Sequence, residues 1–201
     1  MTADSIDWLF GLAQFGIKFG LENIHAVLAE LGHPERQFRS LHVAGTNGKG
    51  SVTAIADTAL HLAGYRTGRY TSPHLLELRE RFCINGTPVS QAEMLDAVQT
   101  VRAAVETLRA RGTLSVHPTF FEVTTAVAFE LFRRQRVDVA VCEVGLGGRL
   151  DATNVLTPVC SAITSIAFDH EQYLGHTLRE NRTRESWNHQ SRSPRDRRTV
   201  A

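Results

Sequence analysis

One loop combines the residue types that proteins use to bind phosphate. Residues 45–51 read Gly-Thr-Asn-Gly-Lys-Gly-Ser, between an apolar run at 41–44 and a helical pattern at 52–60. Glycines let backbone N–H groups approach an anion, and a helix N-terminus and a lysine add positive charge. The loop therefore predicts a phosphate site made by Thr46, Asn47, Gly48, Lys49, Gly50 and Ser51.

The spacing of this loop differs from the strict Walker pattern. That pattern places four residues between its glycines and a hydroxyl residue directly after the lysine. Here two residues lie between Gly45 and Gly48, and Gly50 separates Lys49 from Ser51. An ordinary glycine-rich turn between a strand and a helix is the alternative, although the lysine and the serine together favour phosphate.

The elements around the loop indicate an α/β fold. Strand, helix and strand follow one another at 41–44, 52–60 and 66–70, and such a βαβ unit predicts a parallel sheet. The helix expected at 120–134 is apolar around most of its circumference, so we expect it to be buried. The other expected elements are helices at 5–15, 22–31 and 91–111, the last behind a capping box, and strands at 80–84, 137–142 and 159–163.

Polar side chains follow three of the expected strands. Ser72 comes after 66–70, Glu143 after 137–142 and His170 after 159–163. In open α/β sheets, ligands lie outside the carboxyl ends of the strands. Glu143 is the natural ligand for a Mg²⁺ ion that bridges ATP phosphates, with a surface acid or a helix cap as the alternative. Ser72 and Asp169-His170 are weak signals alone, because such residues are more often structural.

Composition bounds the class of protein. The 201 residues are 42% hydrophobic, which suits one sizeable core, or one domain and part of another. Neither a membrane span nor a signal peptide is expected. Three widely spaced cysteines, Cys83, Cys142 and Cys160, predict buried thiols in a reducing cytoplasm rather than a disulfide set or a zinc site. The net charge of +1 hides a basic end, since residues 179–201 hold seven arginines and three acids.

Taken together, four motifs closely resemble the folylpolyglutamate synthase/dihydrofolate synthase family of Mur-ligase-like, ATP-dependent amide ligases. They are residues 45–51, Thr71-Ser72-Pro73-His74-Leu75, residues 143–154 and Asp169-His170. The resemblance covers about residues 5–180 in the family's order. It implies a P-loop ATPase domain with a mostly parallel sheet flanked by helices. It also implies that ATP phosphorylates a pterin-linked carboxylate and that the amine of L-glutamate then attacks the acyl phosphate.

The resemblance also implies roles for individual residues. Gly48, Lys49, Gly50 and Ser51 would hold the ATP phosphates, and Ser72, Glu143 and His170 would anchor Mg²⁺, with Lys49, Glu143 and His170 as the catalytic set. The pterin side would be Phe19, Gly20 and Leu21, then Thr119, Phe120, Phe121 and Glu122, then Leu150, Asp151 and Ala152. The expected cofactors are ATP and Mg²⁺, and the expected substrates are L-glutamate and folate or dihydropteroate. We expect a monomer that binds neither nucleic acid nor membrane.

The resemblance ends after residue 180. The family continues with a helix close to Ile-Ala-Arg-Glu-Lys-Ala-Gly-Ile-Ile, whose lysine is carbamylated, whereas residues 181–189 read Asn-Arg-Thr-Arg-Glu-Ser-Trp-Asn-His. One set of codons for the family helix, preceded by one extra A and read in the new frame, encodes those residues. We therefore expect residues 1–180 to be an incomplete N-terminal and central ATP-binding domain. Residues 181–201 are expected to be an out-of-frame, disordered tail, without the family's C-terminal glutamate-binding domain.

Alternative functions remain at this point. A truncated chain is expected to be inactive as a ligase, and a non-catalytic ATP- or folate-binding remnant is the first alternative. A cell-wall Mur ligase is a weaker one, because such enzymes carry a substrate domain before the loop and a threonine after the lysine. Only 44 residues precede Gly45, and Gly50 follows Lys49. A generic small-molecule kinase ranks lower still.

Overall fold

The computed structural model describes residues 2–16 and 20–167. Its centre is a six-stranded sheet in the order β4-β3-β2-β5-β1-β6. Strands β2, β5, β1 and β6 are parallel, whereas β3 and β4 continue the sheet antiparallel beyond β2. The strands are β1 (Arg39–Ala44), β2 (Thr67–Tyr70), β3 (Phe82–Ile84), β4 (Thr87–Pro88), β5 (Val139–Glu143) and β6 (Cys160–Ile163).

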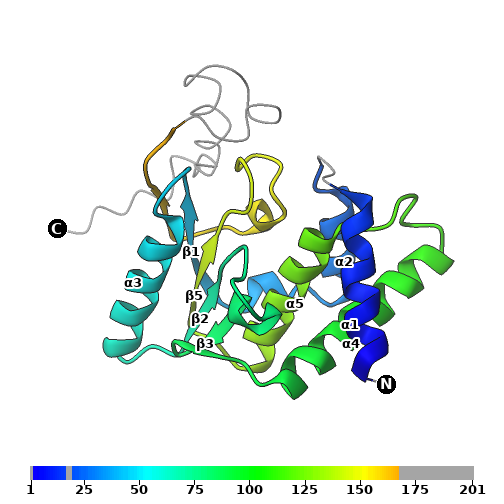
Figure 1. Ribbon diagram of the computed structural model, residues 1–201, viewed down its shortest axis with the longest axis horizontal. Coiled ribbons are helices and arrows are strands. Elements are labelled where there is room, and N and C mark those ends of the chain that lie inside the picture. Colours follow the sequence, from blue (N-terminus) through cyan, green and yellow to red (C-terminus); the bar gives the residue numbers. More distant parts are fainter. Residues whose placement is uncertain (1, 17–19, 168–201) are drawn as a thin grey trace.

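Helices cover both faces of this sheet (Figure 1). Helix α3 (Lys49–Leu62) packs on one face and α5 (Phe120–Arg134) on the other, while α1, α2 and α4 form an outer layer against α5. Because α5 lies between the sheet and that layer, every residue from Glu122 to Phe132 is buried. The outer helices are α1 (Thr2–Gly11), α2 (Glu22–Glu30) and α4 (Gln91–Ala110).

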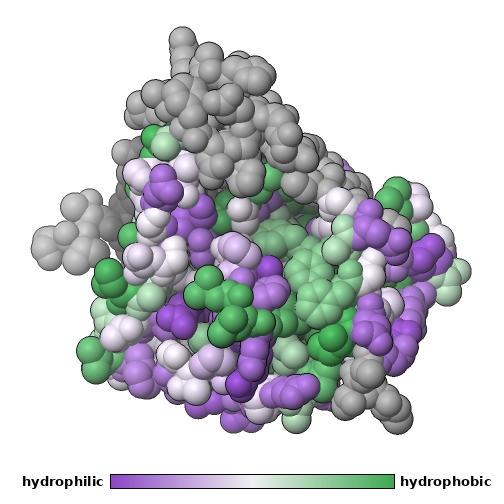
Figure 2. Space-filling model, viewed as in Figure 1, coloured by the Kyte–Doolittle hydropathy of each residue, from purple (hydrophilic) through white to green (hydrophobic). Residues whose placement is uncertain are grey.

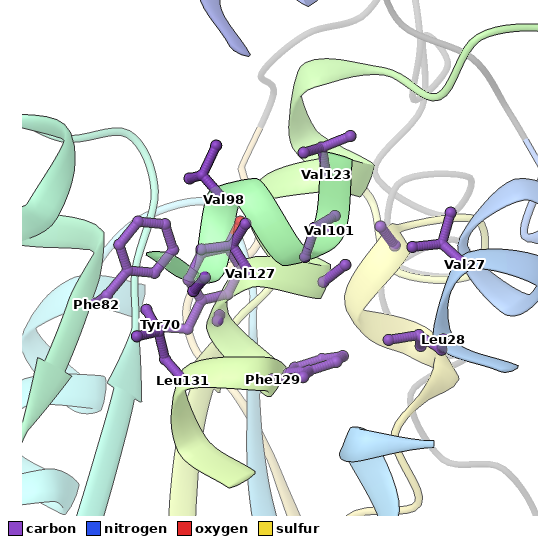
Figure 3. Packing of buried hydrophobic residues seen from close by; sticks show 14 of the residues in the cluster. Val27, Leu28, Tyr70, Phe82, Val98, Val101, Val123, Val127, Phe129 and Leu131 are labelled. Atoms are coloured by element: carbon purple, nitrogen blue, oxygen red, sulfur yellow. The ribbon is translucent and has the colours of Figure 1, made fainter. Parts of the chain in front are cut away.

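The core lies between the sheet and the outer helices (Figure 3). Side chains from α5 meet Val98 and Val101 of α4, Val27 and Leu28 of α2, and two aromatic rings from the strands. Those rings, Tyr70 and Phe82, are stacked with centroids 5.9 Å apart. Full burial of a large hydrophobic side chain stabilises a fold by roughly 1.5–3 kcal/mol. Because α5 supplies many of these side chains, it is the main organiser of this half of the domain.

Two capping boxes set the starts of the long helices. Ser90 Oγ accepts from the Glu93 N–H at 3.2 Å and Glu93 Oε2 accepts from the Ser90 N–H at 2.8 Å, which confirms the predicted start of α4. Thr119 and Glu122 repeat the arrangement at the start of α5. Such reciprocal bonds satisfy N–H groups that a helix end leaves without a partner.

The predicted fold class is confirmed, with differences at several elements. The helix expected at 5–15 is α1 followed by a 3₁₀ turn, and residues 80–81 of the expected strand belong to another 3₁₀ turn before β3. The strand β4 was not predicted. The four 3₁₀ turns are η1 (Leu12–Phe15), η2 (Pro34–Arg36), η3 (Leu78–Arg81) and η4 (Ala152–Val155).

The cysteine prediction is partly wrong. Cys83 and Cys142 are buried, but Cys160 is exposed, because β6 is the edge strand of the sheet and its residues are only partly covered. All three thiols are free. Among the described residues, no helix is both long and apolar enough to cross a bilayer. The predictions for residues 168–201, including Asp169, His170 and the tail, lie outside the described residues.

One glycine makes a sharp test of this packing. A Cβ atom at Gly68 of β2 would lie 2.7 Å from Phe132 Cδ1, and Phe132 cannot move aside because it is fully buried against Phe38. We predict that Gly68→Ala lowers the unfolding free energy by about 1–3 kcal/mol in urea denaturation, from overpacking. Gly11→Ala is the matched control, since its Cβ meets nothing within 4 Å and its backbone is helical; it should be neutral or stabilising. Equal stability of the two variants would contradict the packing.

Candidate functional site

The parallel strands bring three separate loops to one edge of the sheet. In the register, Val43 of β1 pairs with Glu143 of β5, and Tyr70 of β2 pairs with Cys142. The segments that follow β1, β2 and β5 therefore leave the sheet side by side, at its carboxyl edge. These segments are the glycine loop at 45–51, the loop at 71–77 and the loop at 144–151.

The glycine loop opens directly into helix α3. Gly48 is the residue before the helix and has φ +85°, a left-handed conformation that glycine adopts without strain. No side chain caps this helix, and Gly48, Gly50 and Ser51 are exposed, so the first-turn N–H groups are open to a ligand. Lys49 Nζ donates to the carbonyl oxygens of Gly45 at 2.7 Å and Thr46 at 3.1 Å. The loop thus has the open N–H groups and the nearby cation that an anion needs.

Thr46 and Asn47 have a structural role in the loop. The Thr46 N–H donates to the Ser165 oxygen at 2.8 Å, and Thr46 Oγ1 accepts from the Ala167 N–H at 3.0 Å. Asn47 forms an antiparallel bridge with Ser165, whose hydroxyl donates to the Asn47 oxygen. These bonds fasten the loop to the chain after β6. The Thr46 hydroxyl is therefore already engaged by the protein.

Glu143 lies between the glycine loop and the loop after β2. The residue is 5% exposed, and its Oε2 accepts from the Ser72 N–H at 3.4 Å. A Cβ at Gly50 would lie 3.8 Å from the same oxygen, so the start of α3 is adjacent. Burial raises the pKa of Glu143, while the Ser72 N–H and the charges of Lys49 and Arg81 act in the opposite direction. The structure thus brings together Ser72, Glu143 and the lysine loop, as predicted.

The described side chains at this place, Ser72 and Glu143, suit a hard cation. The buried Glu143 accepts only one long hydrogen bond from the described residues. Burying a carboxylate with so few partners costs free energy unless a positive charge is near. Ser72 and Glu143 supply oxygen ligands, which Mg²⁺ prefers. Within residues 2–16 and 20–167, no group of three or more His, Cys, Asp or Glu side chains could hold a metal. The third expected ligand, His170, lies outside those residues.

A cavity of about 320 Å³ adjoins this carboxylate site. Ser72 lines this cavity together with most of the residues expected on the pterin side. These residues come from the loop before α2, the start of α5 and the start of η4. On the face drawn in Figure 2, hydrophobic side chains gather over the region of α5. The lining residues are Gly16, Gly20, Ser72, Pro73, Arg81, Thr119, Phe120, Phe121, Glu122, Gly145, Leu146, Leu150, Asp151 and Ala152.

Two predicted residues are not placed in this cavity. Leu21 precedes the first residue of α2 and packs against the hydrophobic core instead. Phe19 lies outside the described residues. The eight others expected on the pterin side all line the cavity, so the structure brings together segments that are about 100 residues apart in the chain.

Two acidic residues line the cavity, Asp151 and Glu122, and they differ in the hydrogen bonds that they already accept. Asp151 Oδ2 accepts the N–H groups of Gly145 at 3.0 Å and Leu146 at 2.9 Å, and Oδ1 accepts from the N–H and hydroxyl of Thr153. Four donors therefore already occupy this carboxylate. Glu122 Oε2 serves the capping box, but the buried Oε1 has no partner. Of the two acids, only Glu122 therefore has a carboxylate oxygen without a hydrogen-bond partner.

A buried histidine connects the cavity wall to strand β1. His42 is fully buried, its Nε2 lies 2.7 Å from Thr153 Oγ1, and Thr153 in turn binds Asp151. Burial lowers the pKa of His42 to about 4, so its ring is neutral in the folded protein at neutral pH. This chain of bonds holds the loop at 144–151 against the sheet. It was not anticipated, because a histidine inside an apolar strand carries no sequence signal of its partner.

Arg81, Pro73, Gly145, Leu146 and Gly16 also line the cavity without having been predicted there. Arg81 was hidden by the strand expected at 80–84, since it lies in η3 instead. The tight approach at Gly145 has a clear cause, because a Cβ there would lie 2.5 Å from Phe121 Cζ. A glycine two residues after the end of a strand is the signal that could have indicated this close approach.

The sequence of this chain is similar to those of known proteins. A comparison with models of protein families finds no match. The chain is 44% identical over 178 residues to the dihydrofolate synthase/folylpolyglutamate synthase of Bacillus subtilis, covering 88% of this chain and 41% of that protein. It is 41% identical over 167 residues to the dihydrofolate synthetase of Saccharomyces cerevisiae, covering 82% of this chain and 38% of that protein. Over most of its length, the chain therefore matches part of a protein of the folylpolyglutamate synthase/dihydrofolate synthase family.

Solved structures of this family share the fold. The apo form of L. casei FPGS superimposes with a TM-score of 0.88 at 37% identity, over 93% of this chain and 45% of that one. E. coli FolC in complex with DHPP and ADP gives a TM-score of 0.81 at 34% identity, over 90% and 43%. An FPGS–AMPPCP complex gives 0.85 at 38% identity, over 92% and 44%. The chain therefore spans less than half the length of the family members named here.

The buried His42 predicts an acid sensitivity. The unfolded chain takes up a proton near pH 6.5, whereas the folded chain does so only near pH 4, so the unfolding free energy should fall as pH drops between these values. We expect this residue to account for about 3 kcal/mol of the loss. The unfolding free energy, measured by urea denaturation, should change less between pH 7 and pH 4.5 for His42→Gln than for the unmodified chain. The exposed His25→Gln is the control, and a pH dependence of His42→Gln equal to that of the control would contradict the assignment.

Proposed function

We propose that this chain carries the ATP-phosphate site and the acceptor site of a ligase that adds L-glutamate to folate or dihydropteroate. The observation that carries the proposal is the adjacency of two sites of different chemistry. Ser72 lines the apolar cavity and also donates to Glu143, whose carboxylate lies beside the start of α3. A phosphate donor on the loop and a carboxylate in the cavity would therefore meet at Ser72 and Glu143.

The proposed reaction needs no protein nucleophile. A carboxylate oxygen of the acceptor attacks the γ-phosphorus of ATP, and ADP leaves, which forms an acyl phosphate. The amine of L-glutamate then attacks the acyl carbon, the amide bond forms, and phosphate leaves as the nitrogen loses its proton. The protein positions the reactants and neutralises charge, which are the main contributions to phosphoryl transfer.

The residues of the carboxyl edge would divide this work. The N–H groups at the start of α3 and Lys49 would hold the phosphates. Ser72 and Glu143, with His170, would hold a Mg²⁺ ion that offsets phosphate charge. The pair of Phe120 and Phe121 would contact the flat rings of the acceptor, while Glu122 Oε1 would accept from ring N–H groups.

Solved structures of similar proteins support this assignment through the ligands that they contain. E. coli FolC was solved with DHPP and ADP, and an FPGS was solved with AMPPCP. The cavity volume of about 320 Å³ also falls in the range of small-molecule sites. Residues 1–180 would then be the amino-terminal and central ATP-binding part of such a ligase, with 181–201 read out of frame. Determining the DNA sequence around codon 180 tests that reading, and an unshifted frame there would refute it.

Lys49 gives the test of the phosphate site. We predict that Lys49→Ala weakens Mg²⁺–AMPPCP binding to the 201-residue chain by about 10- to 100-fold, the equivalent of one or two charge-assisted hydrogen bonds. Isothermal titration calorimetry measures this directly. Arg111→Ala is the matched control, because it removes an exposed cation from the end of α4. Equal affinities of the two variants would refute the site.

Turnover needs a separate measurement. A chain in which the family reading frame is restored after residue 180 should release phosphate only when ATP, L-glutamate and dihydropteroate or tetrahydrofolate are all present. Lys49→Ala should abolish that release. Nucleotide binding without turnover in the restored chain would favour a non-catalytic binding protein instead.

A further inference from the structure

Arg81 is a buried cation in the cavity wall. It is 6% exposed, ends the 3₁₀ turn η3, and lies with its guanidinium carbon 5.2 Å from the centre of the Phe120 ring. No ion pair joins it to an acid in the part of the chain that the structure describes. A buried charge without an opposite partner is costly, so a site of this kind is completed by an anionic ligand.

The hydrogen bonds of Arg81 leave one side of the guanidinium open. Its Nε donates to His74 Nδ1 at 2.9 Å. The terminal nitrogens Nη1 and Nη2 make no hydrogen bond to another described residue. Two parallel N–H donors at the end of an arginine match the two oxygens of a carboxylate.

The bond from Nε also fixes which way the guanidinium faces. His74 can accept at Nδ1 only as a neutral ring that carries its proton on Nε2. The guanidinium carbon lies over the Phe120 ring, so this group contacts both His74 and Phe120. These two contacts hold the guanidinium of a residue that lines the cavity.

We propose that Arg81 binds the carboxylate of the acceptor and so selects substrates that end in one. The proposal rests on the proposed function and names the group that recognises the reacting end of the acceptor. The pterin ring of pteroate is uncharged at neutral pH, so the carboxylate is the anion that it offers. Arg81 lines the same cavity as Ser72, which donates to Glu143, so a carboxylate held by Arg81 would lie in the cavity that adjoins the phosphate loop.

The test compares two ligands that differ by one charge. Pteroate and its carboxamide, which has the same rings and no negative charge, are titrated into the 201-residue chain by calorimetry. The unmodified chain should bind pteroate at least about 10-fold more tightly than the carboxamide, as a bidentate charged pair implies. Arg81→Met keeps a long unbranched side chain without the charge, and should lose that preference while its affinity for the carboxamide is unchanged. Arg81→Lys should keep a reduced preference.

The outcomes separate the possible roles of Arg81. An equal loss of affinity for both ligands in Arg81→Met means that the residue only supports the cavity, and refutes the proposal. If Mg²⁺–AMPPCP affinity falls while the preference for pteroate stays, Arg81 belongs to the phosphate site, which also refutes it. If the unmodified chain binds neither pteroate nor the carboxamide, the proposed function fails, and this proposal fails with it. Should Arg81→Met not fold by circular dichroism, the preference of Arg81→Lys decides in the same way.

Discussion

The parallel pairing of β1 and β2 with β5 is the constraint on which the site depends. A strand in a parallel sheet leaves the edge at its carboxyl end, so neighbouring strands in register deliver their following loops to one place. Val43 opposite Glu143 and Tyr70 opposite Cys142 define that register. A lysine loop, a serine and a buried carboxylate from three distant segments become neighbours as a result.

The rest of the structure fixes how those loops leave the sheet. Bonds from the glycine loop to Ser165 and Ala167 hold it beside the start of α3. The linked side chains of His42, Thr153 and Asp151 hold the loop after β5, with the Gly145 and Leu146 N–H groups bound by Asp151. These bonds satisfy polar groups inside the protein, where an unpaired group is costly. The cavity is thereby walled by backbone that has little freedom to move.

Local patterns were enough to predict the elements with strong periodicity. The helix at 120–134 was expected with the bounds that the structure shows, because its apolar residues and the residues at its start are signals within one segment. The meeting of Ser72, Glu143 and the lysine loop followed from the general geometry of parallel sheets. The members of the cavity came from the family resemblance, since no periodicity links Gly20 to Asp151.

Long-range contacts account for what the sequence did not indicate. Arg81 lies in a 3₁₀ turn set by bonds from the N–H groups of Leu75 and Glu77 to Glu80, and its role depends on His74 and Phe120. The partners of His42 and Thr46 are more than 100 residues away in the chain. The exposure of Cys160 follows from the place of β6 at the sheet edge, which the strand pattern alone does not reveal.

The central claim is that the phosphate loop and the cavity form one site that meets at Ser72 and Glu143. Paramagnetic relaxation tests it most directly, with Mn²⁺ in place of Mg²⁺ and with AMPPCP and pteroate bound together to the chain. Mn²⁺ should enhance the relaxation of the benzoate-ring protons of pteroate more strongly than that of the pterin-ring proton. The reverse order, or the absence of any enhancement in bound pteroate, would contradict it.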